Sequence, residues 1–151
     1  MTMPLNAVDP HIVKFIRKHH ILTLATSMDN MPYCATCFYA YNPAENLFII
    51  TSDKETRHGK EAMQQPIVAG AIALETRIIG KIQGVQLTGE LEELTGESLK
   101  TYRKEYLKRF PYAAPFLKDT PFWIIRPNFL KLTDNNLGFG KKLIWSAMKD
   151  A

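Results

Sequence analysis

Six short runs with β-strand character, separated by turns and a few helical segments, constrain the fold of this chain most. The runs are rich in β-branched, aromatic or alternating apolar residues and are bounded by turn-forming residues. Many short strands with few and short helices are typical of small antiparallel barrels rather than of α/β sheets. The sequence therefore predicts a mainly β protein, with a six-stranded antiparallel barrel and flanking helices. The expected strands are residues 21–26, 33–41, 47–52, 67–74, 81–94 and 122–133.

Three helices are expected beside these strands. Asp9 and Pro10 form a strong helix start, because an acidic N-cap followed by proline suits the first helical turn. The second helix should follow the third strand and stop before Pro66, and the third should end at Pro111. The expected helices therefore cover about residues 10–20, 53–64 and 97–110.

Composition fits an ordinary globular chain. With 151 residues, 46% of them hydrophobic and 23% charged, the chain suits one domain and needs no metal or disulfide to stabilise its core. The longest apolar run, residues 67–74, is far too short to span a bilayer. The first residues hold no cationic segment leading into an apolar one, as a signal peptide would, so a cytoplasmic protein is expected.

The third expected helix is basic. Between Glu97 and Lys118 there are six basic residues against two acidic ones, an excess that equals the whole-chain net charge of +4. A basic face can meet nucleic acid or the phosphates of a cofactor. The apolar residues of this helix recur at core spacing rather than as an exposed stacking platform, which favours a solvated face and argues against a nucleic-acid partner. These apolar residues are Leu99, Tyr102, Tyr106 and Phe110.

The two cysteines, Cys34 and Cys37, form a C-x-x-C sequence inside the second expected strand. A zinc site of this type needs two more ligands at recognisable spacing, and the sequence has no second cysteine pair. Odd spacing on a strand sends the two side chains to opposite faces of the sheet. We therefore expect two structural cysteines, with neither a metal site nor a redox pair.

The stretch from Leu47 to Pro66 predicts a phosphate-binding site. An apolar strand ends in Thr51 and Ser52, and residues 52–55 fit the capping-box pattern of a helix start. A helix N-terminus presents free N–H groups and a positive dipole end, which suit an anion. The alternative is an ordinary capped helix whose basic first turn is solvated. The cationic side chains expected in the first two turns are Lys54, Arg57 and His58.

The order of these elements resembles the pyridoxamine 5′-phosphate oxidase-like split-barrel superfamily, which binds FMN. The resemblance rests on a helix, a three-strand meander ending in Thr-Ser, a Thr-Arg-His helix start, a Gln-Pro-x-Val turn and a Gly-x-Leu-Glu strand. Within the superfamily, IQGVQLTGE, KRFP, LTDNNLGFGKKLIW and TRH are similar to one little-characterised bacterial family. The resemblance covers residues 10–146 and implies one split-barrel domain over residues 1–151.

The resemblance also implies a homodimer with two FMN sites between the subunits. In the superfamily a hydroxyl–Arg–Lys cluster after the third strand holds the FMN phosphate, and here that position has Thr56, Arg57 and His58. Thr51 matches the superfamily hydroxyl near the phosphate, and Ser52 adjoins it. The backbone of the second strand would face the isoalloxazine ring near Thr36 and Cys37.

Two departures from the superfamily pattern bear on function. His58 stands where the superfamily usually has lysine, and Lys54 is the candidate to supply the missing charge. The arginine and histidine residues that bind pyridoxal phosphate in the true oxidases have no match, which argues against pyridoxamine oxidation itself. The tail adds Lys141 and Trp145 as candidate cofactor contacts, and a core or dimer-interface role is the alternative for the tryptophan.

Three classes of function stay open. No Ser/His/Asp spacing, carboxylate pair, glycine-rich phosphate loop or metal cluster stands out, so no catalytic residue is assigned. The first class is an FMN-dependent oxidoreductase acting on an unknown small molecule, in which the flavin brings the redox chemistry. The second is a non-catalytic flavin- or haem-binding module. The third is a cofactor-free barrel that binds nucleic acid through its basic helix.

Overall fold

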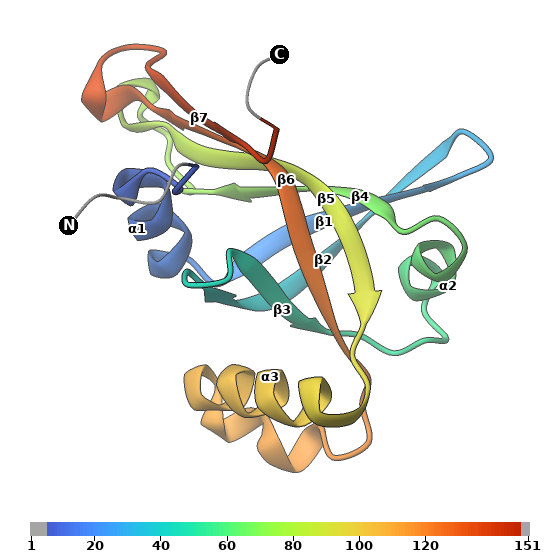
Figure 1. Cartoon of the computed structure of the whole chain (residues 1–151). Helices are drawn as coiled ribbons and strands as arrows, with labels where there is room; N and C mark the ends of the chain where they lie inside the picture. Colours follow the sequence, from blue (N-terminus) through green and yellow to red (C-terminus); the bar gives the residue numbers. More distant parts are fainter. Residues whose placement is uncertain (1–5, 149–151) are drawn as a thin grey trace.

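The computed structural model describes residues 6–148, and over that range seven strands form one antiparallel sheet with helices packed around it (Figure 1). The helices are α1 (Pro10–Lys18), α2 (Arg57–Gln64) and α3 (Gly96–Arg109), with short 3-10 helices η1 (Ile79–Lys81), η2 (Pro111–Phe116) and η3 (Asn135–Leu137). The strands are β1 (Ile21–Met28), β2 (Met31–Asn42), β3 (Leu47–Thr51), β4 (Ile67–Ala73), β5 (Gln83–Glu93), β6 (Phe122–Asp134) and β7 (Lys142–Ser146).

The sheet closes on itself through β6. The strand order is β3-β2-β1-β4-β5-β6-β7, and an additional β3–β6 pairing joins the two ends of a six-strand ring. Residues 122–125 of β6 pair with β3, while residues 129–133 pair with β7 on the same edge. The other edge of β6 pairs with β5 along almost its whole length. The arrangement is a split barrel, as predicted.

The predicted six-stranded barrel is confirmed, and the sheet has one further strand that was not predicted. The six expected strands make up the ring, and a seventh, β7, extends the sheet beside β6. The expected strand over residues 81–94 also begins later, at Gln83, because residues 79–81 form η1. Strand β7 is only five residues long and follows Gly138, Gly140 and Lys141, so its sequence carries little periodic signal.

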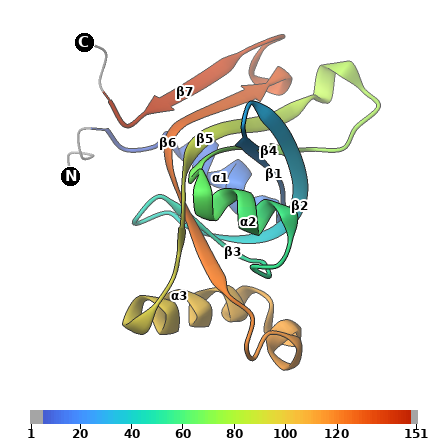
Figure 2. The same cartoon turned by 90° about the vertical axis from the view of Figure 1, so that its right-hand side faces the viewer.

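Two apolar clusters hold the molecule together. The larger fills the ring, where Ile12 and Ile16 of α1 and Ala62 of α2 pack against side chains from the strands. Helix α2 lies across an opening of the ring in Figure 2. The smaller cluster lies between α3 and the outer side of β3 and β6, so β3 is buried on both faces. The α3 side of this cluster has the predicted core residues Tyr102, Tyr106 and Phe110, with Leu99 partly buried beside them.

The predicted placement of the two cysteines on opposite faces of the strand is confirmed. Cys34 is exposed and Cys37 is buried, as expected for odd spacing on a strand. Burial raises the pKa of the Cys37 thiol to about 11, which keeps it protonated near neutral pH. Residues 6–148 contain no cluster of three or more His, Cys, Asp or Glu side chains arranged to hold a metal ion.

Within the same residues, none of the helices combines the length and the apolarity that crossing a bilayer requires.

A β-bulge at Thr88 and Gly89 generates the first testable prediction. A Cβ atom at Gly89 would lie 2.9 Å from the Pro127 Cα and closer still to the Arg126 carbonyl oxygen. Backbone cannot yield as a flexible side chain does, so Gly89→Ala should lower the free energy of unfolding by about 1–3 kcal/mol. Thermal denaturation followed by circular dichroism measures this loss.

Gly80→Ala is the matched control for that substitution. Gly80 lies in η1, and a Cβ atom there meets nothing within 4 Å. The control should therefore leave the melting temperature nearly unchanged. Equal melting temperatures for Gly89→Ala and wild type would contradict the close packing of β5 on β6.

Candidate functional site

The loop between β3 and α2 holds the residues that the sequence marks as a phosphate site, but the helix starts later than predicted. The capping box at residues 52–55 was wrong: Thr56 is the N-cap, its hydroxyl accepts from the Gly59 N–H, and α2 begins at Arg57. Residues 52–56 form a loop, in which the Asp53 side chain accepts from the Glu55 N–H. The loop folds tightly over the helix start, because a Cβ atom at Gly59 would lie 2.7 Å from the Asp53 carbonyl oxygen.

Two hydroxyls and one imidazole meet at this helix start. The Ser52 hydroxyl forms a short hydrogen bond with His58 Nε2, and the Thr56 hydroxyl lies 3.4 Å from both atoms. The Ser52 carbonyl accepts from Trp123 Nε1 at 3.0 Å, which fixes the loop to β6. Thr51 lies one residue earlier and turns away, since its hydroxyl donates to the Pro121 carbonyl at 2.8 Å. We call Ser52, Thr56, Arg57 and His58 the α2 site.

The imidazole of the α2 site carries little positive charge near neutral pH. Burial lowers the pKa of His58 below its ordinary value, and the nearby Glu61 carboxylate opposes that effect only in part. His58 can therefore exchange hydrogen bonds with Ser52 and Thr56, but it does not supply a permanent positive charge to the site.

Arg57 is held by two neighbours that the sequence did not reveal. Its Nε donates to Glu61 Oε1 at 2.8 Å, and its Cζ lies 4.2 Å from the centre of the Tyr33 ring. Glu61 is only 8% exposed, and its second oxygen accepts from the Thr26 hydroxyl at 2.8 Å. Hydrogen bonds from Arg57 and Thr26 lower the pKa of the Glu61 carboxyl, so the pair is ionised.

The outer edge of the Arg57 guanidinium, which carries the two Nη atoms, is available to bind an anion. The Arg57 side chain is 52% exposed, and among the described residues only its Nε has a hydrogen-bond partner. A guanidinium whose Nη atoms are available can bind a phosphate through two parallel hydrogen bonds. The Thr56 hydroxyl donates to the Asp53 carbonyl at 2.7 Å, so the α2 site offers the Ser52 hydroxyl and an oriented guanidinium at a helix N-terminus, which fits a phosphate group.

Lys54 is engaged elsewhere. Its Nζ lies 2.7 Å from Glu93 Oε1 on β5, so the structure places its charge beside a carboxylate. The Lys54 side chain forms no hydrogen bond with the α2 site within residues 6–148.

The remaining candidates lie on two other parts of the sheet. Thr36 and Cys37 are on β2, with Thr36 exposed and Cys37 turned into the core. Lys141 is exposed just before β7, and Trp145 on β7 packs against the core and donates to the Asn6 carbonyl at 2.8 Å. Strand β7 and helix α2 lie at opposite sides of the molecule in Figure 1. One chain therefore does not bring Lys141 and Trp145 to the α2 site.

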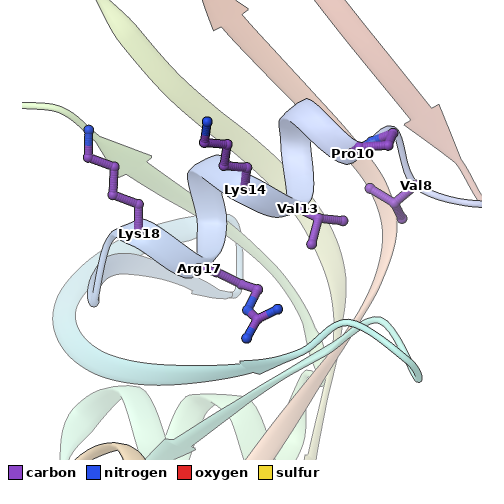
Figure 3. A pocket seen from close by; sticks show the side chains of 6 residues that line it. All are labelled: Val8, Pro10, Val13, Lys14, Arg17 and Lys18. Atoms are coloured by element: carbon purple, nitrogen blue, oxygen red, sulfur yellow. The ribbon is translucent and has the colours of Figure 1, made fainter.

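Two hollows lie away from the α2 site. An open cavity of about 410 Å³ lies on the outer face of β1, β2, β4 and β5, where small side chains such as Ala25, Ala69 and Ala71 leave the sheet uncovered. A wider groove of about 710 Å³ runs along α1, with Lys14, Arg17 and Lys18 beside an apolar edge (Figure 3). In Figure 3 the two lysines and the arginine point to different sides of the helix, so they do not converge on one ligand.

Sequence comparison identifies the family. No family model matches the chain. A UPF0306 protein of Photorhabdus laumondii is 41% identical over 134 residues, covering 89% of this chain and 92% of that protein. A UPF0306 protein of Yersinia pestis is 36% identical over 138 residues, covering 91% of this chain and 92% of its own length. The chain belongs to the UPF0306 family.

Solved structures show that this UPF0306 chain has the predicted split-barrel fold. A heme binding protein from Mycobacterium smegmatis superposes with a TM-score of 0.77 at 18% identity, over 97% of this chain and 60% of that one. A FAD-binding protein from Mesorhizobium loti gives 0.69 at 18% identity, over 81% and 91%. A putative pyridoxamine 5′-phosphate oxidase from Listeria innocua gives 0.64 at 14% identity, over 80% and 93%. At these identities the likeness establishes the fold alone.

The environment of His58 in the UPF0306 chain generates a second prediction. The pKa of His58 should lie below 6.5 because its imidazole is partly buried. Glu61→Gln should lower the pKa further, since it removes the carboxylate that stabilises the charged imidazole. An NMR titration of the histidine ring protons measures both values.

Glu97→Gln, on the exposed start of α3, is the control and should leave the His58 titration unchanged. A His58 pKa at or above 6.5 in the wild-type chain would contradict the partly buried position of the ring.

Proposed function

We propose that this UPF0306 protein binds FMN, with the phosphate at the α2 site, and acts as a flavin-dependent oxidoreductase on a small molecule. The observation that carries the proposal is the guanidinium of Arg57, which Glu61 and Tyr33 hold so that its outer edge stays exposed. The Ser52 hydroxyl lies at the same helix start. This donor set suits a phosphate monoester better than a flat apolar ligand.

The chain's own residues bind and orient the cofactor in this proposal. Arg57 supplies a charge-assisted pair of donors, and the Ser52 hydroxyl adds a neutral donor when His58 Nε2 donates in the hydrogen bond between them. The Thr56 hydroxyl already donates to the Asp53 carbonyl at 2.7 Å, so it holds the loop rather than the phosphate. Within the described residues, the part of β2 before Tyr39 pairs with β1 alone and leaves its other edge open near Thr36 and Cys37, so the ring system would lie along that backbone edge. A bound flavin supplies the electron-transfer chemistry, and the protein sets its access and orientation.

We further propose that the protein is a homodimer with its cofactor sites at the subunit interface. Lys141 and Trp145 lie far from α2 in one chain, so they could contact the same cofactor only from a second copy. The uncovered outer face of the sheet and a set of exposed apolar side chains around η1 and η3 support such a partner, because monomers rarely expose patches of this kind. The exposed apolar residues are Ile78, Ile79, Ile82, Leu137 and Phe139.

A haem-binding module is the second candidate, because two of the solved structures with this fold are named as heme-binding or heme-storage proteins. A haem iron is usually held by a histidine nitrogen. His58 is the histidine of the α2 site, and its Nε2 is already hydrogen-bonded to Ser52. Because this hydrogen bond occupies Nε2, the α2 site suits a flavin phosphate better than a haem iron. The absorption spectrum of the purified protein separates the two.

Replacement of Arg57 gives the test of the phosphate site. Arg57→Ala removes a charged donor and should weaken FMN binding about 30- to 150-fold, equivalent to about 2–3 kcal/mol. Arg57→Lys should lose part of that affinity, because an ammonium cannot reproduce the planar two-donor contact. Quenching of flavin fluorescence during titration measures the dissociation constants.

Lys104→Ala is the control for this titration. Lys104 is exposed on α3 and forms no salt bridge within residues 6–148, so its removal should leave FMN affinity unchanged. Equal dissociation constants for wild type and Arg57→Ala would contradict a phosphate at the α2 site. The absence of FMN binding in all variants would favour the cofactor-free barrel.

The proposed dimer generates a further prediction. Multi-angle light scattering at micromolar concentration should give twice the chain mass of 17.2 kDa. Phe139→Asp should shift the protein toward the monomer, because it places a charge within the exposed apolar set. Phe116→Asp is the control, since Phe116 is equally exposed, at 83%, but lies on η2 beside α3. A monomeric wild-type protein would overturn the proposal.

A further inference from the structure

The cationic side chains around the α2 site are already paired with carboxylates. Arg57 Nε lies 2.8 Å from Glu61, and Lys54 Nζ lies 2.7 Å from Glu93. Lys60, on the next turn of α2, lies 3.4 Å from Glu55. Residues 53–61 contain three basic and three acidic side chains, so this segment has no net charge. Glu93 adds a further negative charge from β5.

His58 does not add a positive charge to this neutral segment. His58 stays largely neutral near pH 7 because burial lowers its pKa, and it is hydrogen-bonded to Ser52 rather than to an acid. The α2 site therefore offers a phosphate well-placed hydrogen-bond donors without a net positive field. A phosphate monoester carries about −1.5 to −2 charges near pH 7, so the neighbouring carboxylates oppose its binding.

We infer that the flavin is an exchangeable ligand of this protein, bound and released during its function, rather than a permanently held prosthetic group. The inference rests on the proposed function and concerns the same site. The carboxylates that neutralise Arg57 and Lys54 weaken the hold on the phosphate, and the hydrogen bonds and ring contacts give selectivity without very slow release. A flavin that exchanges in this way serves as a substrate or is passed to another protein.

Substitution of Glu61 and substitution of Glu93 would have different effects on the α2 site. Glu61 both neutralises Arg57 and orients it, and it also accepts from the buried Thr26 hydroxyl, so its substitution has opposing effects. Glu93 contacts Lys54, and no other side-chain partner of its carboxylate occurs within the described residues. Glu93→Gln therefore removes one negative charge and releases one lysine without disturbing Arg57.

Glu92→Gln is the matched control. Glu92 is the preceding residue of β5, so its side chain points to the opposite face of the strand. It also forms a salt bridge, with Arg126 at 3.5 Å, which makes the two substitutions comparable in charge and in the loss of an ion pair.

The experiment measures FMN and riboflavin binding to wild type, Glu93→Gln and Glu92→Gln by fluorescence titration. Glu93→Gln should bind FMN about tenfold more tightly than wild type, with unchanged riboflavin affinity, because riboflavin lacks the phosphate. Glu92→Gln should match wild type for both ligands. Wild-type protein mixed with FMN should lose most of its flavin absorbance on gel filtration, and Glu93→Gln should retain more of it.

Two results would overturn the inference. One is a stoichiometric amount of FMN that stays with the wild-type protein through gel filtration, and the other is an FMN affinity that Glu93→Gln does not increase. A wild-type protein that binds no FMN at all would overturn the proposed function, and the exchange inference with it. Tight binding that is lost in Arg57→Ala would instead keep the phosphate site and reject only the exchange.

Discussion

The double pairing of β6 is the constraint on which the rest of the structure depends. Residues 122–125 pair with β3 on one edge, and residues 123–125 also pair with β5 on the other, so this segment joins the two ends of the ring in the described part of the chain. The same segment positions the α2 site, because Trp123 donates to the Ser52 carbonyl and Thr51 donates to the carbonyl of Pro121. A shift of β6 would therefore open the ring and displace the loop before α2 together.

The buried Glu61 is the second constraint. Its carboxylate links the Thr26 hydroxyl on β1 to Arg57 on α2, and the Tyr33 ring on β2 covers the guanidinium. Three elements thus fix the direction of one exposed side chain. An exposed arginine loses considerable side-chain entropy when it binds an anion, and a guanidinium that is already oriented loses less. Glu61 gives this orientation and, at the same time, reduces the positive charge that Arg57 can offer.

The sequence predicted the ring well and the site only in part. Alternating and β-branched residues located six strands, and three- and four-residue spacing located the core face of α3. The helix cap was misplaced because residues 52 and 56 both carry hydroxyls, and tertiary contacts with His58 and Trp123 decide that Ser52 does not cap. The pairing of Lys54 with Glu93 joins segments far apart in the chain, so no local pattern reveals it.

The neutral side chain of His58 agrees with the charge pattern around it. A lysine at this position would bring a permanent charge close to Ser52 and Thr56, whereas the partly buried imidazole exchanges neutral hydrogen bonds with them. With Arg57 and Lys54 each beside a carboxylate, the site recognises an anion more by the placement of its donors than by attraction at a distance. Recognition of this kind discriminates by geometry, because each donor reaches its partner only over a narrow range of distance and angle. β6 and Glu61 therefore fix where the donors lie, and the paired carboxylates set how strongly those donors hold a ligand.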